Sequence, residues 1–377
     1  MLAPYVLPGE RVRAEVAQEK PGLIRARTLE VLDPAADRVE PQCPYFARCG
    51  GCHYQHASYE AQLAAKHAIL GEELRRLGKI EPPAEIQVLA GEPWAYRNRV
   101  QLHIEGQSLG YREARSHKLC PITQCPIASP KLNEAIAAFN EMLRDRRWPR
   151  FLRSLEIFTD EQCVQLNIVE AAQPVARRFF DWSAERIPGL VAGALDYAGR
   201  FRVSRNSFFQ VNRLLIDALV ENATAGAFGE TAVDLYSGVG LFAVALARSF
   251  QRVVAVESNS VAVSDLRFNA ERRAGAAACR PGVIQAEHAT AEAYLEALAG
   301  APDFMLLDPP RAGLGKTIVR RLLDLKPPRL TIVSCDPATL ARDLAQLLSG
   351  GCRIEKMSLV DLFPQTYHLE TVVHLIW

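Results

Sequence analysis

The sequence predicts an α/β protein whose C-terminal half is a doubly wound, mostly parallel sheet. After Asn206, helix-like segments at 210–223, 241–249, 260–273 and 338–348 alternate with strand-like segments such as AVDLY, VVAVE, FMLLD and LTIVS, and two last strands follow. Strict alternation of this kind buries a parallel sheet between two layers of helices. The chain also has 377 residues, which is enough for two or three domains with separate cores.

The residues before 201 predict two further domains. Residues 1–40 alternate apolar and polar positions between turn dipeptides, as short antiparallel strands do, so we expect a small β module there. Residues 61–78 have helical spacing, with apolar positions 63, 70 and 74 on one face. From 95 to 170, strand-like runs surround the helix-like run KLNEAIAAFNEML, which indicates an α+β domain. We therefore predict domains at 1–40, 41–200 and 201–377, with a cysteine-rich region at 41–92 and 125 inside the second.

Positive and negative side chains nearly balance: 44 Lys and Arg against 43 Asp and Glu give a net charge of +1. Any nucleic-acid contact must therefore come from local basic patches. The first twenty residues carry charges and prolines where a secretory signal would be apolar, and no apolar run reaches the ~18 residues of a membrane span. We expect a soluble, cytoplasmic protein with no membrane contact, and no obligate protein partner is evident. In that reducing compartment, nine cysteines indicate metal binding or catalysis rather than disulfides.

The residues that follow the C-terminal strands predict a ligand site, since doubly wound sheets bind ligands at the carboxyl ends of their strands. The first strand contains Asp234 and leads into Gly238 and Gly240, where glycine lets the backbone approach a ligand. Glu257 ends the second strand and can accept both ribose hydroxyls of an adenosine. Asp308 begins an Asp-Pro-Pro-Arg turn after a later strand, although an Asp here could also be a helix cap.

Two nucleotide cofactors fit this pattern. Ala243 and Glu257 would complete a NAD fingerprint around the Gly-x-Gly turn. The Asp before the glycines and the Asp-Pro-Pro turn instead resemble class I S-adenosylmethionine-dependent methyltransferases, in which such a turn faces the methyl donor. We expect S-adenosylmethionine as the cofactor, with NAD as the alternative.

Cys335 is the predicted nucleophile. It follows the strand LTIVS, directly before a helix N-terminus and near Arg311, where a thiolate is favoured. Glu370 starts the last strand two residues after His368, so strand alternation places both side chains on one face and either could be a base. The cysteines that we expect to be structural are Cys163, Cys279 and Cys352.

Taken in order, SFFQVN (207–212), DLYSGVG, VES, LLDPPR, IVSCDPATLARD and FPQTYHLE resemble the RNA uracil-5-methyltransferase family over nearly the whole chain. The resemblance implies a Rossmann-like methyltransferase domain in which Cys335 is the nucleophile and Glu370 the proton acceptor. The S-adenosylmethionine site would comprise Gln210, Tyr236, Glu257 and Asp308, beside Asp234, Gly238 and Gly240. In this chemistry a thiolate adds to carbon 6 of uracil, which makes carbon 5 nucleophilic, and a base then removes the carbon 5 proton. Cytosine-5 methylation and RNA binding without catalysis are the alternatives.

Clustered cysteines predict a metal site. Cys43, Cys49 and Cys52 lie close together in a reduced protein, and their spacing alone fits zinc or an iron–sulfur cluster. The segments CPYFARCGGCHYQ and CPIASPKLN resemble the iron–sulfur branch of the same family, which binds a four-iron, four-sulfur cluster. That resemblance implies Cys125 as the fourth ligand, with Cys120, which also precedes Pro-Ile, as the alternative.

The iron–sulfur branch acts mainly on 23S ribosomal RNA, so the resemblance implies that partner, with transfer RNA as the alternative. YVLPGERVRAEV resembles the later strands of the family's TRAM domain, an OB-like RNA-binding barrel whose first strands are missing here. The basic and aromatic segment 94–118 predicts RNA contacts by Arg97, Arg99 and Arg115. Because the reactive carbons lie inside the base, we expect the target uridine to be flipped out of its stack.

Overall fold

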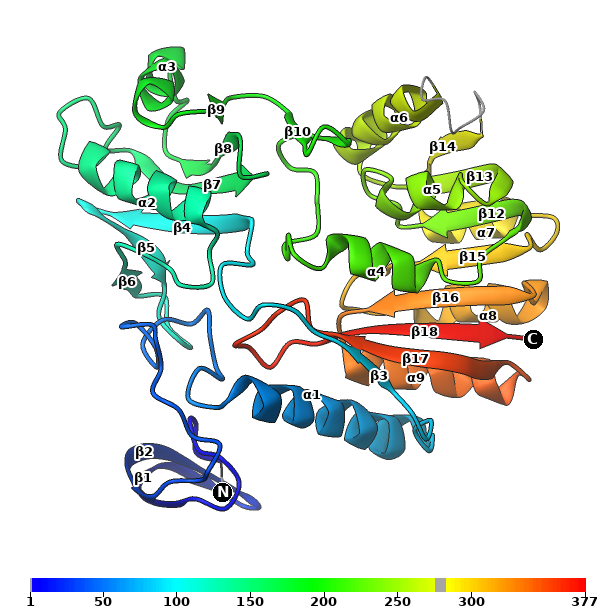
Figure 1. Cartoon of the computed structure of the whole chain (residues 1–377), viewed down its shortest axis with the longest axis horizontal. Coiled ribbons are helices and arrows are strands. Elements are labelled where there is room, and N and C mark those ends of the chain that lie inside the picture. The colour runs from blue at the N-terminus through cyan, green and yellow to red at the C-terminus, as the bar shows by residue number, and fades with distance from the viewer. Residues whose placement is uncertain (1, 275–282) are drawn as a thin grey trace.

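The computed structural model describes residues 2–274 and 283–377, and it confirms the predicted α/β fold class. A small antiparallel hairpin, a six-stranded sheet and an eight-stranded sheet follow one another along this part of the chain (Figure 1). No helix in it is both long and apolar enough to cross a bilayer. The division at residues 40 and 200 stays a prediction, because two elements of the middle segment join the C-terminal sheet, as described below.

The N-terminal module is one long hairpin. Strands β1 (Arg11–Lys20) and β2 (Leu23–Asp33) pair antiparallel around a turn at Gly22, where φ is 76°. Only glycine adopts such a φ without strain. The hairpin is tied to the next segment by Arg38, whose guanidinium binds the carboxylate of Glu10 and lowers its pKa to about 2.

The middle domain is an antiparallel sheet with two helices, as the α+β prediction requires. Its strands lie in the order β6-β5-β4-β7-β8-β9, and only β9 runs parallel to its neighbour. These elements are β4 (Arg99–Glu105), β5 (Ser108–Arg112), β6 (Leu119–Pro121), β7 (Leu152–Thr159), β8 (Val164–Ala171), β9 (Leu190–Val191), α2 (Pro130–Met142) and α3 (Arg177–Arg186).

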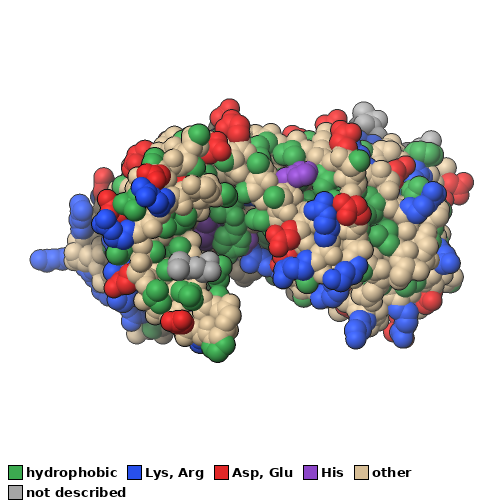
Figure 2. Space-filling model, turned by 90° about the horizontal axis from the view of Figure 1, so that it is seen from below, with side chains coloured by type: hydrophobic (Ala, Val, Ile, Leu, Met, Phe, Trp, Pro, Cys, Tyr) green, Lys and Arg blue, Asp and Glu red, His purple; other side chains and the backbone are tan. Residues whose placement is uncertain are grey.

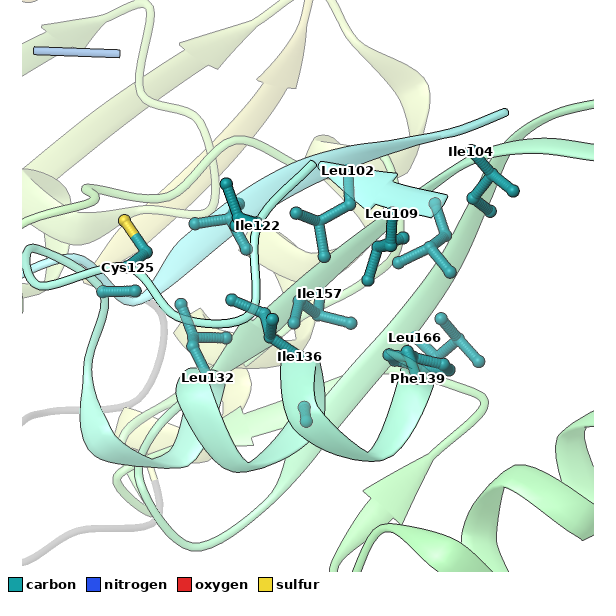
Figure 3. Packing of buried hydrophobic residues seen from close by; sticks show 14 of the residues in the cluster. Leu102, Ile104, Leu109, Ile122, Cys125, Leu132, Ile136, Phe139, Ile157 and Leu166 are labelled. Carbon is teal, nitrogen blue, oxygen red and sulfur yellow. The ribbon is translucent and has the colours of Figure 1, made fainter. Parts of the chain in front are cut away.

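The core of the middle domain reaches the predicted cysteine site. Helix α2 begins at Pro130 after its N-cap Ser129, and its side chains Leu132, Ile136 and Phe139 pack against the sheet. Figure 3 shows Cys125 at one end of this core, with its sulfur directed away from the neighbouring apolar side chains. The packed core therefore fixes the backbone of Cys125 and leaves its thiol free to face another segment.

The C-terminal sheet has the order β14-β13-β12-β15-β16-β18-β17-β3. Neighbours from β14 to β16 run parallel, and β18 is antiparallel to both β16 and β17. Chain order reverses at β12, which has β13 on one side and β15 on the other, so the ligand crevice lies at the carboxyl ends of these strands. The strands are β12 (Gly229–Leu235), β13 (Phe250–Glu257), β14 (Ile284–His288), β15 (Phe304–Leu307), β16 (Arg329–Ser334), β17 (Arg353–Val360) and β18 (Glu370–Ile376).

Helices cover both faces of this sheet, and alternate residues of β12 point to each face. One apolar cluster joins Val233 to α7, α8 and α9, and the other joins Ala232 to α4, α5 and α6. The helices are α4 (Ile216–Ala223), α5 (Leu241–Leu246), α6 (Ser260–Ala274), α7 (Ala291–Ala297), α8 (Gly315–Leu325) and α9 (Pro337–Ser349). A short hairpin, β10 (Leu195–Tyr197) and β11 (Phe201–Val203), precedes them.

After Asn206, the structure differs from the predicted elements in two places. Strand β14 and helix α7 were not predicted, because β14 is a half-exposed edge strand with a weak apolar pattern. The helix predicted at 210–223 begins only at Ile216. Before it, the side chain of Asn212 accepts a hydrogen bond from the backbone N–H of Leu214, and Gln210 turns toward Asp308. Local side-chain bonds of this kind compete with helix formation.

Helix α1 (Tyr59–Glu73) and strand β3 (Gln87–Leu89) belong to the middle of the sequence but pack on the C-terminal sheet. β3 pairs parallel with β17 at the sheet edge, and α1 runs beneath the sheet beside α9 (Figure 1). A π-helical turn (Leu74–Gly78) extends α1, and Leu70 and Leu74 enter the same apolar cluster as α9. The cysteine-rich segment that precedes α1 is thereby anchored to the C-terminal domain.

Polar side chains on α1 hold the loop that leads into β18, residues 361–369. Lys66 is fully buried, and its Nζ lies 2.5 Å from the Asp361 carboxylate and 2.9 Å from the Phe363 carbonyl oxygen. Gln62 donates to the side-chain oxygen of Gln365 at 3.0 Å and accepts from its backbone N–H at 2.9 Å. We call these contacts the α1 clamp.

We predict that Lys66→Met lowers the free energy of unfolding by about 3–5 kcal/mol, since it leaves the buried Asp361 carboxylate without its cation. Chemical denaturation measures the loss. The double variant Lys66→Met/Asp361→Asn removes both charges and should recover part of the stability. A single variant as stable as the wild type would show that the pair contributes nothing.

Candidate active site

Cys335 and Glu370 lie side by side at one edge of the C-terminal sheet. Cys335 directly follows β16, and β18 begins at Glu370 and runs antiparallel to β16. The register pairs Ser334 with Thr371, so Cys335, which follows Ser334, lies opposite Glu370, which precedes Thr371. Cys335 is partly exposed, whereas Glu370 is 4% exposed. The sheet thus places a thiol within reach of a ligand and a carboxyl behind it.

Two carboxyl groups beside the thiol bind protons more tightly than usual. Burial raises the pKa of Glu370 well above its ordinary value, and the nearby charge of Asp308 raises it further. Burial also raises the pKa of Asp308 to about 7. The cation of Arg311 has the opposite effect and lowers the pKa of Glu370. A carboxyl with a raised pKa is a stronger base once it is ionised, which suits proton transfer.

The expected activation of Cys335 is wrong for the free protein. Burial raises the pKa of its thiol to about 11, and the charges of Glu370 and Asp308 raise it too. Arg311 lowers the pKa as predicted, but its effect is smaller than these three. The thiol therefore needs a bound cation or a proton acceptor before it becomes a nucleophile.

His368 lies outside the last strand, so the predicted alternation does not reach it. β18 begins at Glu370, and the imidazole of His368 lies in the preceding loop, 4.4 Å between ring centroids from Tyr367. Burial and nearby cations, of which Arg311 has the largest effect, lower the pKa of His368 to about 4. The carboxyl of Glu370, rather than this ring, pairs in register beside Cys335.

The predicted cofactor residues after β12 form a left-handed turn. Tyr236, Gly238 and Gly240 have φ values of 62°, 54° and 92°. A Cβ at Gly240 would lie 2.6 Å from Leu266, so glycine is needed there for space as well as conformation. A Cβ at Gly238 would meet nothing within 4 Å, which leaves open space over the turn.

Carboxylates frame that open space. Glu257, at the end of β13, accepts hydrogen bonds from the backbone N–H of Gly238 at 2.9 Å and of Asn259 at 2.7 Å. Across the crevice, Gln210 Nε2 lies 3.5 Å from Asp308. Asp234 is fully buried, neither of its carboxylate oxygens has a hydrogen-bond partner in the described chain, and burial raises its pKa strongly. An acidic, glycine-lined crevice of this kind fits a cationic adenosyl compound.

The four predicted metal ligands line one cavity of about 200 Å³. Cys43, Cys49, Cys52 and Cys125 all contribute to its wall, whereas Cys120 does not. Burial raises the pKa of Cys49 and Cys52 to about 12. No group of three or more His, Cys, Asp or Glu side chains among residues 2–274 and 283–377 is spaced to hold a single metal ion.

The other cysteines that the structure describes do not line this cavity. Cys120 is fully buried in β6, opposite Tyr111. Cys163 is partly buried between β7 and β8, and Cys352 is buried before β17. Cys279, expected to be structural, lies outside the described residues.

The three predicted RNA-binding arginines have different surroundings. Arg115 is exposed in the turn after β5. Arg97 is half-buried, and its Nε donates to the carbonyl of Arg99 at 2.8 Å. Arg99 points inward: its guanidinium lies 4.3 Å from the centre of the Phe158 ring and donates to the Ser207 carbonyl at 2.8 Å. Its position in β4 makes Arg99 part of the packing between the domains rather than an open cationic surface.

Sequence analysis did not identify two pairs of residues that shape the site. Gln62 and Lys66 were missed because a polar residue on a helix is normally solvated. Their spacing is the signal that could have found them, since 62, 66, 70 and 74 form one stripe and all four are buried. Tyr367 and His53 were missed because their rings come together only through the loop before β18, 4.3 Å between centroids.

Comparison with known proteins identifies the family. The family model described as tRNA (uracil-5-)-methyltransferase matches residues 190–377. The chain is 33% identical to the 23S rRNA (uracil(1939)-C(5))-methyltransferase of Halomonas elongata, over 98% of this chain and 83% of that protein. An uncharacterized RNA methyltransferase of Streptomyces avermitilis is 36% identical over 98% and 91%.

A solved structure agrees over the whole chain. The crystal structure of the tRNA (uracil-54, C5)-methyltransferase of Pyrococcus abyssi, in complex with S-adenosyl-L-homocysteine, covers 100% of this chain and 95% of that one. Its TM-score is 0.77 at 26% identity. With a thiol and a carboxyl paired beside a glycine-lined crevice, this chain belongs to the RNA uracil-5-methyltransferase family.

Proposed function

We propose that this protein methylates carbon 5 of one uridine in 23S ribosomal RNA, with S-adenosylmethionine as the methyl donor. The observation that carries the proposal is the pairing of Cys335 with Glu370 at the carboxyl edge of the sheet. The resemblance to the Halomonas elongata enzyme, whose name specifies 23S rRNA, supports the choice of substrate.

The methyl donor fits the crevice at the end of β12. S-adenosylmethionine supplies an electrophilic methyl group on a sulfonium cation. Glu257 would hold the ribose hydroxyls, because its carboxylate already lies at the glycine turn. Gln210 and Asp308 would lie on the other side, and the buried Asp234 carboxyl, whose oxygens have no hydrogen-bond partner among the described residues, lies near the end of β12. A bound cation lowers the pKa of neighbouring acids, so it favours ionised Asp308 and an ionised Glu370 that can accept a proton.

The chain's own residues account for the remaining steps. The Cys335 thiol gives up its proton, for which Asp308, with a pKa of about 7, is a nearby acceptor, and the sulfur adds to carbon 6 of uracil. Carbon 5 then forms a bond to the methyl group as the S–CH3 bond of the donor breaks, and S-adenosyl-L-homocysteine is the leaving group. Glu370 removes the proton from carbon 5, and the electron pair of that C–H bond re-forms the C5=C6 double bond as the S–C6 bond breaks. The cysteine leaves as thiolate, and the product is 5-methyluridine.

A second candidate substrate is transfer RNA, because the Pyrococcus abyssi structure belongs to a tRNA enzyme. Mapping 5-methyluridine in ribosomal and transfer RNA, from cells with and without this protein, tests the proposal. We expect one 23S uridine to lose its methyl group when the protein is absent. Loss confined to transfer RNA would replace the substrate, and no loss in either would refute RNA uracil-5 methylation by this chain.

We also propose that Cys43, Cys49, Cys52 and Cys125 hold a four-iron, four-sulfur cluster. Support comes from the cavity that all four cysteines line and from the resemblance of the segments CPYFARCGGCHYQ and CPIASPKLN to the iron–sulfur branch of the family. In a four-iron cluster each thiolate binds a different iron, which suits thiols spread around a cavity. The cluster would join the segment before α1 to the middle domain.

The two catalytic roles predict different stopping points. Glu370→Gln should still form the adduct and transfer the methyl group, but elimination should slow by roughly 10²–10⁴-fold because carbon 5 keeps its proton. A methylated protein–RNA complex should therefore accumulate and survive denaturing electrophoresis. Cys335→Ala should give neither adduct nor product.

His368→Ala is the matched control for this experiment, since the imidazole of His368 lies two residues before Glu370, in the loop that precedes β18. It should turn over without accumulating the complex. If His368→Ala traps the methylated complex and Glu370→Gln turns over normally, the base assignment passes to the histidine.

The cluster assignment predicts different effects for two neighbouring cysteines. Anaerobically purified protein should be brown and contain about four iron atoms per chain. Cys125→Ser should remove most of the iron, whereas Cys120→Ser should not, because Cys120 does not line the cavity. Stoichiometric zinc without visible absorbance would contradict the cluster, and the reverse pattern of variants would exchange the two ligands.

A further inference from the structure

A second, larger cavity reaches the loop that leads into β18, where Tyr367 lines it. Its volume is about 1230 Å³, above the roughly 300–1,000 Å³ of small-molecule sites. Its walls come from residues 3–8, the segment around 47–65, the turn after β5 and Tyr367. Figure 2 shows a hollow with hydrophobic side chains in its depth and both basic and acidic side chains on the surface around it. The space suits a strand of several units rather than one small molecule.

An aromatic platform forms the wall nearest the active site. The Tyr367 ring lies 4.3 Å from that of His53 and 4.4 Å from that of His368, between ring centroids, and Tyr367 is 49% exposed. The loop is fixed beneath it, because the backbone N–H groups of His53 and Tyr54 both donate to the Gln365 carbonyl. An exposed ring on a fixed backbone costs little entropy when a flat ligand stacks on it.

The same cavity has an available cation. Arg115 lines it, is exposed, and forms no ion pair with any described residue. Arg115, His53 and Tyr367 all line this cavity, so the guanidinium and the platform face the same space. Of the acidic side chains in the wall, Glu113 pairs with Arg48, and Asp37 accepts a hydrogen bond from a serine hydroxyl. Arg115 is therefore free for an anion.

We infer that Tyr367 and Arg115 form a subsite for a nucleotide adjacent to the target uridine, with its base stacked on Tyr367 and its phosphate against Arg115. Aromatic stacking next to a cation is how proteins hold single-stranded RNA. Tyr367 is three residues before Glu370, a separation of at most about 11 Å. A nucleotide one or two steps from the flipped uridine spans that distance. The inference rests on the proposed function, since it assigns the flanking part of the same substrate.

Fluorescent RNA tests the subsite directly. 2-Aminopurine is placed in turn at the positions flanking the methylated uridine, in an RNA fragment that the wild type modifies. We expect the wild type and Tyr367→Phe to quench the probe at one position by stacking. Tyr367→Ala should not quench it and should bind the fragment roughly ten-fold more weakly, with unchanged S-adenosylmethionine affinity. Arg115→Gln should reduce the slope of log affinity against log salt by about 1.

Phe228→Ala is the matched control, because Phe228 is also an exposed aromatic ring beside an arginine but does not line the cavity. It should quench and bind as the wild type does. If Tyr367→Ala quenches and binds normally while the wild type methylates the fragment, the subsite is refuted and the function stands. If the wild type methylates no RNA, the proposed function itself fails.

Discussion

The buried contact between Lys66 and Asp361 is the constraint on which the active site depends. Both side chains have no solvent exposure, and their ion pair joins helix α1 to the loop before the last strand. That loop ends at Glu370, so the α1 clamp fixes where the proposed base begins. The same helix follows the cysteine segment directly, and His53 and Tyr54 of that segment donate to the carbonyl of Gln365. The proposed cysteine site, the aromatic platform and the proposed catalytic carboxyl thus share one support.

The electrostatic environment of Cys335 keeps its thiol unreactive when no ligand is bound. Burial and mutual proximity keep protons on Glu370 and raise the pKa of Cys335 to about 11. Negative groups that disfavour a thiolate also favour a cation, and a sulfonium methyl donor is a cation. The thiol is therefore expected to become nucleophilic when donor and RNA are both bound. Such coupling limits unwanted alkylation of Cys335.

Much of the active site could be predicted from local sequence, because its residues lie directly after the ends of strands. Asp308 and Cys335 follow apolar strands, and parallel strands bring their carboxyl ends to one edge. Other features depend on tertiary partners. Lys66 has an ordinary helical context, and its partner is 295 residues away. Arg99 carries the charge expected of an RNA contact, but Phe158 and a backbone carbonyl enclose it.

Hydrogen exchange of the loop 361–369 tests the central claim that α1 fixes the catalytic base. Gln62→Ala removes both contacts to Gln365 while leaving Lys66 in place. Gln346→Ala, which changes a glutamine bonded only within α9, is the control. The account predicts that amides of the loop exchange at least ten-fold faster in Gln62→Ala, with β12 unchanged and the control like the wild type. Unchanged exchange in the loop would contradict it.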